Sequence, residues 1–409
     1  MFDCMDQRIF VLARESALTE LLGSNEAAQA MIKQYLGYAT TSMILGWATG
    51  GIIFGMMSDR VGRVKTMVVT LLIYSGFTGL SGTAQSWIDF TIYRFLVGLG
   101  VGGMFGAATT LVAESVPGKF RSMALGSLQA LSATGNIIGS TVSFWIRPGE
   151  ENLLFDFSGW RVLFFVGILP ALLVIPIVTV LKEPQAWLDA RKEAKEGGTH
   201  KNIGSPTELF RSPRWRKNTI VGLCLGVAGM IGLWGIGFFS PELISTALAG
   251  ESQQVIDEVR AKATALQDVG AFIGMLIFTF LATFVGRRLA FLLAFIGCLT
   301  VTMFVFNSLD SATDAYWMLP MMGAVQLAVF AGYSIYFPEL YPTRLRGTGV
   351  GFCYNTVRYL AAPAPILLGY LSTSFGFRNA AIMMCGIYVL GMVALIWAPE
   401  TKGKDLPED

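Results

Sequence analysis

The stretch AESVPGKFRSMALG at 113–126 recurs in altered form as PELYPTRLRGTGVG at 338–351. Both copies carry the same spaced set of one glutamate, one proline, one arginine and one glycine: Glu114, Pro117, Arg121 and Gly126, then Glu339, Pro342, Arg346 and Gly351. Each copy stands where a long apolar run ends and the next begins. The chain therefore looks like two copies of one membrane module, and we expect its function to lie between the copies.

The composition favours a helical bundle in lipid over a soluble globule. Hydrophobic residues make up 53% and charged residues 14% of the 409 residues, and the mean hydropathy is +0.57. A net charge of +2 gives no reason to expect a nucleic acid partner. The five cysteines are scattered through the chain without metal-ligand spacing, and no phosphate-binding G-x-x-x-x-G-K-[ST] pattern or catalytic triad stands out. We expect no cofactor, no metal and no enzyme activity.

Eleven apolar runs are long enough to cross about 30 Å of hydrocarbon at roughly 20 residues each. They fall near 34–57, 67–86, 90–113, 122–146, 160–181, 218–240, 264–285, 289–307, 315–337, 349–373 and 379–398. These runs predict an all-α membrane protein with an N-terminal six-helix bundle at 1–181, a cytoplasmic linker at 182–217 and a C-terminal six-helix bundle at 218–409.

Two bundles of six helices require one more helix than the apolar runs supply. The segment 2–22 stands at the right place, but it is amphipathic and too polar to span a bilayer by itself. We expect Met1 to fall inside the first transmembrane helix, with the upstream half of that helix absent. The alternative is a helix that lies on the membrane surface.

The distribution of lysine and arginine predicts the orientation. If the 57–67 connection is cytoplasmic, the cytoplasmic connections and the linker hold 20 basic residues and the opposite connections hold five. Short cytoplasmic loops carry an excess of lysine and arginine in membrane proteins. We therefore expect a multi-pass protein of the cell membrane with both termini in the cytoplasm.

The connection after the first full span has the pattern G-x-x-x-D-R-x-G-R, formed by Gly55, Asp59, Arg60, Gly62 and Arg63. The glycines permit a tight turn and close helix approach, and the aspartate can cap a helix start and pair with arginines. The pattern resembles the signature of the major facilitator superfamily, which implies secondary transport by alternating access. We expect a latch that holds one state of the cycle; the alternative is a plain basic turn.

The second half keeps part of this pattern. Gly286, Arg287 and Arg288 are present, but Thr283 stands where the aspartate would be, so we expect a weaker latch there. The resemblance implies that the charged residues of the two repeated boxes also take part in gating. These residues are Glu114, Arg121, Glu339 and Arg346.

Arg94 begins the pattern R-x-x-x-G-x-G-x-G in the third apolar run, with Gly98, Gly100 and Gly102. Glycines at this spacing let a neighbouring helix pack closely. The arginine needs a partner, because an unpaired charge near the bilayer centre costs about 3 kcal/mol or more. The pattern resembles the fourth-helix motif of the superfamily, whose arginine is associated with proton movement.

Asp3 and Asp6 resemble the D-G-x-D pattern of aromatic-acid:proton symporters, although Cys4 replaces the glycine. In sugar porters, an aspartate at the place of Asp6 faces the arginine at the place of Arg94. The resemblance therefore implies that Asp6 and Arg94 couple transport to protons, since protonation of the carboxylate would release the arginine. The alternative is a static buried ion pair.

The residues that would contact a sugar match poorly. Gln129 and Asn136 resemble the paired amides of sugar porters, but the stretch 227–234, which ends at Trp234, lacks their glutamine pair. Ser334 also stands where their tenth-helix tryptophan would be. A polyol is therefore disfavoured. Trp234 can supply an aromatic wall to a substrate site, although membrane aromatics more often serve packing.

Arg358 lies near mid-membrane in the run 349–373, with Asn355 one turn away. An arginine that lines a cavity at that depth is explained most simply by an anionic substrate held through two hydrogen bonds. The alternative is a structural pairing with Asp268 or with a backbone carbonyl. Pro363 and Pro365 would let the helix bend during gating.

Together these patterns predict a proton-coupled importer of a small organic anion, such as an aromatic or other carboxylic acid. The expected partners are this substrate, protons and the lipid bilayer, and we expect a monomer. Two alternatives stay open: a symporter or facilitator for a sugar or other neutral solute, and a transporter-like sensor that signals through the linker at 182–217.

Overall fold

The computed structural model describes residues 1–23, 26–150, 157–196 and 203–408, and every regular element in these residues is a helix. The expected all-α membrane fold is confirmed. The chain divides into two compact units. Unit 1 comprises Met1–Glu114, Leu131–Pro206 and Thr343–Thr356, and unit 2 comprises Ser115–Ala130, Thr207–Pro342 and Val357–Asp409. The stretch 115–130 thus belongs to unit 2 and the stretch 343–356 to unit 1, whereas the expected division would place them in the N-terminal and the C-terminal bundle, respectively. The division into bundles at 1–181 and 218–409 stays a prediction.

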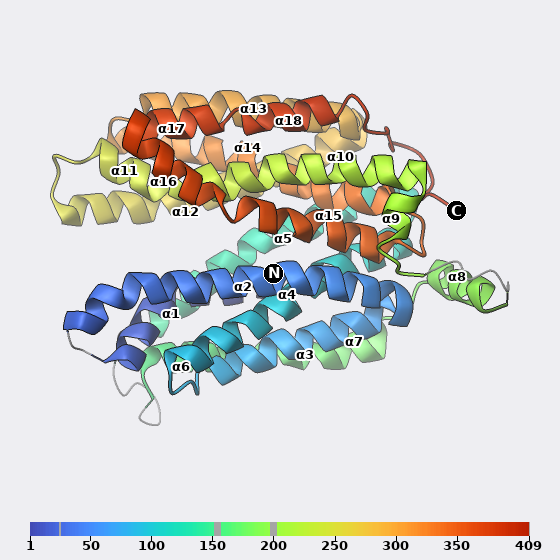
Figure 1. Cartoon of the computed structure of the whole chain (residues 1–409), viewed down its shortest axis with the longest axis horizontal. Coiled ribbons are helices and arrows are strands. Elements are labelled where there is room, and N and C mark those ends of the chain that lie inside the picture. The colour runs from blue at the N-terminus through green and yellow to red at the C-terminus, as the bar shows by residue number, and fades with distance from the viewer. Residues whose placement is uncertain (24–25, 151–156, 197–202, 409) are drawn as a thin grey trace. The chain divides into compact units, whose positions relative to one another are not determined.

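The helices of unit 1 follow the first apolar runs of the sequence (Figure 1). They are α1 (Phe2–Leu22), α2 (Glu26–Val61), α3 (Arg63–Ser81), α4 (Trp87–Ser115), the second part of α5 (Gly118–Trp145), α6 (Gly159–Val166), η1 (Leu169–Leu173), α7 (Val174–Val180) and α8 (Gln185–Glu196), and the first part of α15 (Arg346–Ala361) joins them from later in the chain. Helix α1 packs against α2 and α6, and its side chains Ile9, Phe10 and Leu18 are fully buried. The alternative of a surface-lying N-terminal helix is therefore wrong.

Unit 2 is built from the remaining runs. Its helices are the first part of α5, α9 (Glu208–Arg211), α10 (Pro213–Met230), η2 (Ile231–Ile236), η3 (Gly237–Phe239), α11 (Ser240–Ala247), α12 (Gln253–Phe284), α13 (Arg287–Ser308), α14 (Ala312–Glu339), the end of α15 (Arg346–Ala361), α16 (Ala364–Phe375), α17 (Phe377–Met384) and α18 (Ile387–Ala394). Among the described residues, nine stretches are long and apolar enough to cross a membrane. Helix α1 is not one of them, as its polarity predicted.

The glycines of α4 do what the sequence predicted. A Cβ added at Gly98 would overlap the carbonyl oxygen of Met43, and one added at Gly102 would overlap that of Trp47. Helices α2 and α4 therefore touch backbone to backbone, which only residues without a side chain allow. Gly100 makes the corresponding approach to α3. This close packing places Arg94, one turn before Gly98, in the interior of unit 1.

Four of the apolar runs are interrupted, namely 160–181, 218–240, 349–373 and 379–398. The run 218–240 passes from α10 into the π-helix η2, and the run 349–373 is split into α15 and α16. Pro363 is the N-cap of α16 and Pro365 lies in its first turn, where a proline removes no needed hydrogen bond. The expected proline break is confirmed at this place.

Candidate functional site

Asp6 of α1 and Arg94 of α4 meet inside unit 1. Their side chains are 1% and 0% exposed, and Asp6 Oδ2 lies 3.7 Å from Arg94 Nη1. Thr78 of α3 donates a hydrogen bond to Asp6 Oδ1 at 2.8 Å. The hydroxyl oxygen of Ser81 accepts from Arg94 Nε at 3.1 Å and from Nη2 at 2.6 Å. The structure thus brings together the two residues that the resemblance paired across 88 positions of sequence.

The ion pair is loose at one oxygen of the Asp6 carboxylate. A separation of 3.7 Å is too long for a hydrogen bond, and within the described chain neither Asp6 Oδ2 nor Arg94 Nη1 has a hydrogen-bond partner. A proton can therefore bind at Oδ2 without breaking a hydrogen bond. It would neutralise the carboxylate and remove the attraction that holds the guanidinium.

Arg94 is also held by aromatic rings. Its guanidinium carbon lies 5.5 Å from the ring centroid of Phe10, 5.8 Å from that of Phe90 and 4.7 Å from that of Phe164. Ring faces attract a cation and do not titrate. The charge on Arg94 is therefore stabilised whether or not Asp6 is protonated.

The sequence analysis missed the hydroxyls and rings of this site. Thr78 and Ser81 stand three residues apart inside an apolar run, which places them on one face of α3, and that spacing was the available signal. Asp3 is not brought to Arg94. It accepts a hydrogen bond from the terminal amino group of Met1 at 3.1 Å.

A buried charge cluster joins the first signature to the repeated boxes. Arg63 donates from Nε to Glu114 Oε2 at 3.0 Å and from Nη2 to Glu114 Oε1 at 2.9 Å, a bidentate pair. Arg346 donates to the same Oε1 at 2.5 Å, and the three side chains are fully buried. The backbone carbonyls of Ser58 and Thr343 accept the remaining bonds of Arg63 at 2.8 and 2.7 Å. Paired and hydrogen-bonded in this way, these buried charges are tolerated.

Asp59 caps the start of α15. Its carboxylate accepts from the backbone N–H of Gly347 at 2.9 Å, from that of Thr348 at 2.8 Å and from the Thr348 hydroxyl at 2.6 Å. Arg63 Nη2 lies 3.3 Å away. An aspartate at a helix N-terminus satisfies free N–H groups and complements the helix dipole. Gly55 lies one turn earlier on α2, where an added Cβ would be 2.7 Å from the Gly347 carbonyl.

A second acid caps α3. The carboxylate of Glu183 accepts from the backbone N–H groups of Arg63, Val64 and Lys65 at 2.7, 3.1 and 3.3 Å. Gly62, just before the helix, has a φ of +132°, which favours glycine, and a Cβ there would overlap the same carboxylate. The sequence analysis did not select Glu183.

Unit 2 repeats the arginine–glutamate core. Arg287 donates to Glu339 from Nε at 3.0 Å and from Nη2 at 2.7 Å, and to the Ser122 hydroxyl at 2.5 Å. The Thr401 hydroxyl donates to Glu339 at 2.6 Å. Arg121 is 9% exposed in the same unit and interacts electrostatically with Glu339.

Glu400 caps α13 as Glu183 caps α3. It accepts from the backbone N–H groups of Arg287 and Arg288, both at 3.0 Å, after Gly286 with a φ of +114°. Burial by itself would raise the pKa of Glu400. The hydrogen bonds that the carboxylate accepts from backbone N–H groups of α13 and of the following residues, Thr401 and Lys402, have the larger effect and hold the pKa below its ordinary value. The carboxylate is therefore the stable form.

The two halves differ at the position of Asp59. The hydroxyl of Thr283, its counterpart, donates to the carbonyl of Thr279 in its own helix at 2.8 Å, so it does not cap another helix. This is consistent with the weaker second latch, which stays a prediction. Arg60, also assigned to gating, is exposed and donates to the carbonyl of Ile203 at 3.2 Å.

The expected substrate residues fall in both units. Asn355 and Asn136 belong to unit 1, whereas Gln129, Trp234 and Arg358 belong to unit 2. Asn355 is fully buried, Arg358 is 4% exposed, and the other three are half-buried. The amide of Asn355 donates to a backbone carbonyl one turn earlier at 2.9 Å. A shared substrate site stays a prediction. In the described part of the chain, no group of three or more acidic, cysteine or histidine side chains is placed to hold a metal ion.

Comparison with known proteins gives one consistent family. The Major Facilitator Superfamily model matches residues 1–364. A cis,cis-muconate transport protein of Acinetobacter baylyi is 30% identical over 351 residues, which cover 84% of this chain and 81% of that protein. A gentisate transporter of Corynebacterium glutamicum is 25% identical over 88% of this chain and 78% of its own. The structure of the proton:xylose symporter XylE bound to 6-bromo-6-deoxy-D-glucose matches with a TM-score of 0.80 at 19% identity, over 99% of this chain and 94% of that one.

Proposed function

The chain belongs to the Major Facilitator Superfamily of membrane transporters, and we propose that it imports a small organic acid together with protons. It is a multi-pass membrane protein and not an enzyme. The names of two relatives specify carboxylates, cis,cis-muconate and gentisate, and this supports an acid as the substrate class.

The buried pair of Asp6 and Arg94 is the observation that carries the proton coupling. A carboxylate 1% exposed, with one oxygen free of hydrogen bonds, binds a proton at the expense of one loose ion pair. The released Arg94 keeps its charge against three aromatic rings. We propose that this change shifts the balance between the inward- and outward-open states of the two halves at 1–181 and 218–409.

Arg358 is the proposed anchor for the substrate carboxylate. It is a buried arginine on a helix that breaks two residues before Pro363, so bending of this helix can change its position. A guanidinium offers a planar pair of donors that matches a carboxylate. Asn355, Gln129, Asn136 and Trp234 are proposed to complete the site.

The proposed orientation has both termini and the linker at 182–217 in the cytoplasm of a cell membrane, with the protein acting as a monomer. The 20-to-5 imbalance of basic residues between the two sets of connections supports it.

Uptake into proteoliposomes tests the coupling. Purified wild type should accumulate radiolabelled muconate or gentisate when a proton gradient is imposed, and Asp6→Asn should lose accumulation but keep exchange down a substrate gradient. Asp189→Asn, on the exposed face of α8, is the matched control and should behave as wild type. Accumulation by Asp6→Asn at the wild-type level would remove Asp6 from the coupling role.

The substrate class is tested with acid and amide forms of one compound. Loss of a charge-assisted contact in a partly desolvated site costs about 2–5 kcal/mol, so Arg358→Ala should weaken acid binding about 30-fold or more. Arg358→Lys should weaken it less, because the charge remains. Both variants must first show the wild-type melting profile. If wild type does not prefer the acid, or a sugar is accumulated instead, the substrate is a neutral solute. Binding without uptake would favour a sensor.

A further inference from the structure

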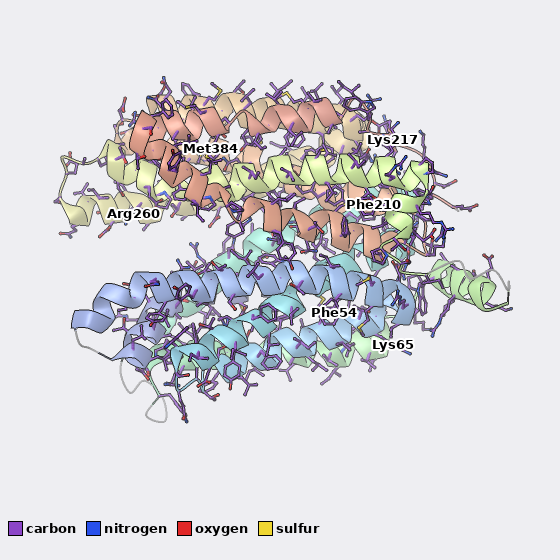
Figure 2. The ribbon with its side chains drawn as sticks, in the orientation of Figure 1. Phe54, Lys65, Phe210, Lys217, Arg260 and Met384 are labelled. Carbon is purple, nitrogen blue, oxygen red and sulfur yellow. The ribbon has the colours of Figure 1, made fainter. Side chains whose placement is uncertain are left out.

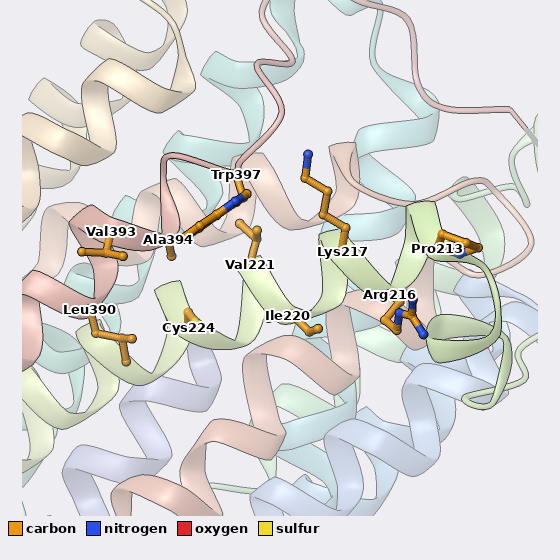
Figure 3. A pocket seen from close by; sticks show the side chains of 10 residues that line it. All are labelled: Pro213, Arg216, Lys217, Ile220, Val221, Cys224, Leu390, Val393, Ala394 and Trp397. Carbon is orange, nitrogen blue, oxygen red and sulfur yellow. The ribbon is translucent and has the colours of Figure 1, made fainter.

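A groove opens on the surface of unit 2 between α10 and α18 (Figure 3). Its volume is about 370 Å³. The walls are apolar: Ile220 and Cys224 come from α10, and Leu390 and Val393 come from α18. Ile220 is 51% exposed although both helices belong to membrane-crossing stretches. A groove of this kind is accessible to the lipid that surrounds the protein.

One end of the groove is positively charged. Arg216 and Lys217 line it at the start of α10, and both are exposed (Figures 2 and 3). Within the described part of the chain, neither side chain makes a hydrogen bond or an ion pair. Trp397, which is 55% exposed, lines the same groove just after α18. Tryptophan beside basic residues is typical of the level of lipid headgroups.

We propose that this groove binds one anionic phospholipid. One acyl chain of this lipid lies along Ile220, Cys224 and Val393. Its phosphate group lies at the membrane surface, in contact with the side chains of Arg216 and Lys217. A guanidinium and an ammonium that lack protein partners are suited to phosphate oxygens. The apolar walls require a ligand with a hydrocarbon chain, which free phosphate and a small acid do not have.

A second groove in unit 1 serves as an internal comparison. It has a volume of about 500 Å³ and is lined by apolar side chains of α2, α3 and α7, including Val61 and Val68. Its charged residues are Lys65 (Figure 2) and Glu183, which carry opposite charges. This groove can accept an acyl chain, but it has no net charge with which to select an anionic headgroup.

Native mass spectrometry of the full chain in detergent measures the selectivity. Phosphatidylglycerol and phosphatidylcholine are added in equal amounts, and bound lipid is counted. Each basic residue near a lipid surface is worth about five-fold in affinity, so wild type should prefer phosphatidylglycerol by up to about 30-fold at low salt and by less at high salt. Arg216→Gln with Lys217→Gln should bring the preference close to one. Lys65→Gln is the matched control and should leave it unchanged.

A fluorescent bimane on Cys224 locates the bound lipid. Cys4→Ser removes the other cysteine that is not buried, since Cys298, Cys353 and Cys385 are buried. In phosphatidylcholine vesicles, brominated phosphatidylglycerol should quench the label more strongly than brominated phosphatidylcholine, and the double glutamine variant should abolish the difference. Equal quenching in wild type, an equal effect of Lys65→Gln on the lipid count, or displacement by excess inorganic phosphate would each overturn the proposal.

Discussion

Asp59→Asn should release the start of α15 from α2. In the wild type, one carboxylate accepts three hydrogen bonds from Gly347 and Thr348, at 2.6 to 2.9 Å, and lies 3.3 Å from Arg63. Asparagine has one acceptor oxygen in place of two, and its amide group would point N–H donors at N–H donors. The negative charge that faces the helix dipole is also lost.

The magnitude follows from the type of bond. A hydrogen bond to a charged group contributes about 1.5–3 kcal/mol, and one between neutral groups contributes about 1 kcal/mol. Three charge-assisted bonds are replaced by at most two neutral ones, so the substitution should cost about 2.5 kcal/mol or more. A cost of about 2.5 kcal/mol shifts the opening equilibrium of this contact about 70-fold toward the open form, and a larger cost shifts it further.

Hydrogen exchange measured by mass spectrometry reads this equilibrium directly. The peptide that holds the Gly347 and Thr348 amides should exchange at least about 70-fold faster in Asp59→Asn, while the α3 amides that donate hydrogen bonds to Glu183 should exchange at the wild-type rate. Thr283→Val, at the counterpart position, should leave the exchange of both peptides unchanged. Transport should slow while substrate affinity stays close to the wild-type value. Unchanged exchange at Gly347 and Thr348, or affinity that falls as steeply as rate, would refute the capping argument.

Three other substitutions test the packing and the charge sites. Gly102→Ala should lower the free energy of unfolding by about 1–3 kcal/mol, because the new Cβ would overlap a backbone carbonyl of α2. Gly76→Ala is the control in the same melting assay. It should be neutral or slightly stabilising, because the space around Gly76 is open. Ser81→Ala removes the acceptor of two N–H groups of Arg94 and should cost about 1–3 kcal/mol of unfolding free energy. Because the pKa of Glu400 lies below its ordinary value of 4.5 in the folded protein, its carboxylate stabilises the fold above that pH and ceases to do so as the pH falls through the lowered pKa. Glu400→Gln should therefore melt earlier than wild type at pH 7, and the difference should shrink as the pH is lowered below 4.5.

The membrane fold could be predicted because its signals are local. Each apolar run became one helix or a series of consecutive shorter helices, and the proline break before α16 was visible as Pro363 and Pro365. The exchange of 115–130 and 343–356 between the compact units was not visible. The unit to which each stretch belongs depends on which helices it packs against, and the hydropathy of the sequence does not indicate these contacts.

The site could be predicted only in part, and for a similar reason. Arg94 was singled out because a rare charge in an apolar run needs a partner, and the resemblance to sugar porters then paired it with Asp6. The rings of Phe10, Phe90 and Phe164 were not found, since a phenylalanine in a membrane helix looks the same whether it faces a cation or a leucine. Glu183 and Glu400 were missed as helix caps because each caps a helix more than 100 residues away.

The burial of a single carboxylate, that of Asp6, apart from the arginine–glutamate clusters has an electrical consequence. Among the described residues, the acidic side chains that are buried are those of Asp6, Asp59, Glu114 and Glu339, and the last three lie in the charge clusters at the helix ends. Under the proposed coupling, this one titratable site would carry one proton per cycle. A monocarboxylate would then cross without net charge, whereas a dicarboxylate would carry one negative charge inward against an inside-negative potential, at about 2.3 kcal/mol per 100 mV. The voltage dependence of uptake should thus differ between the two kinds of acid, and the membrane potential itself would favour the monocarboxylate.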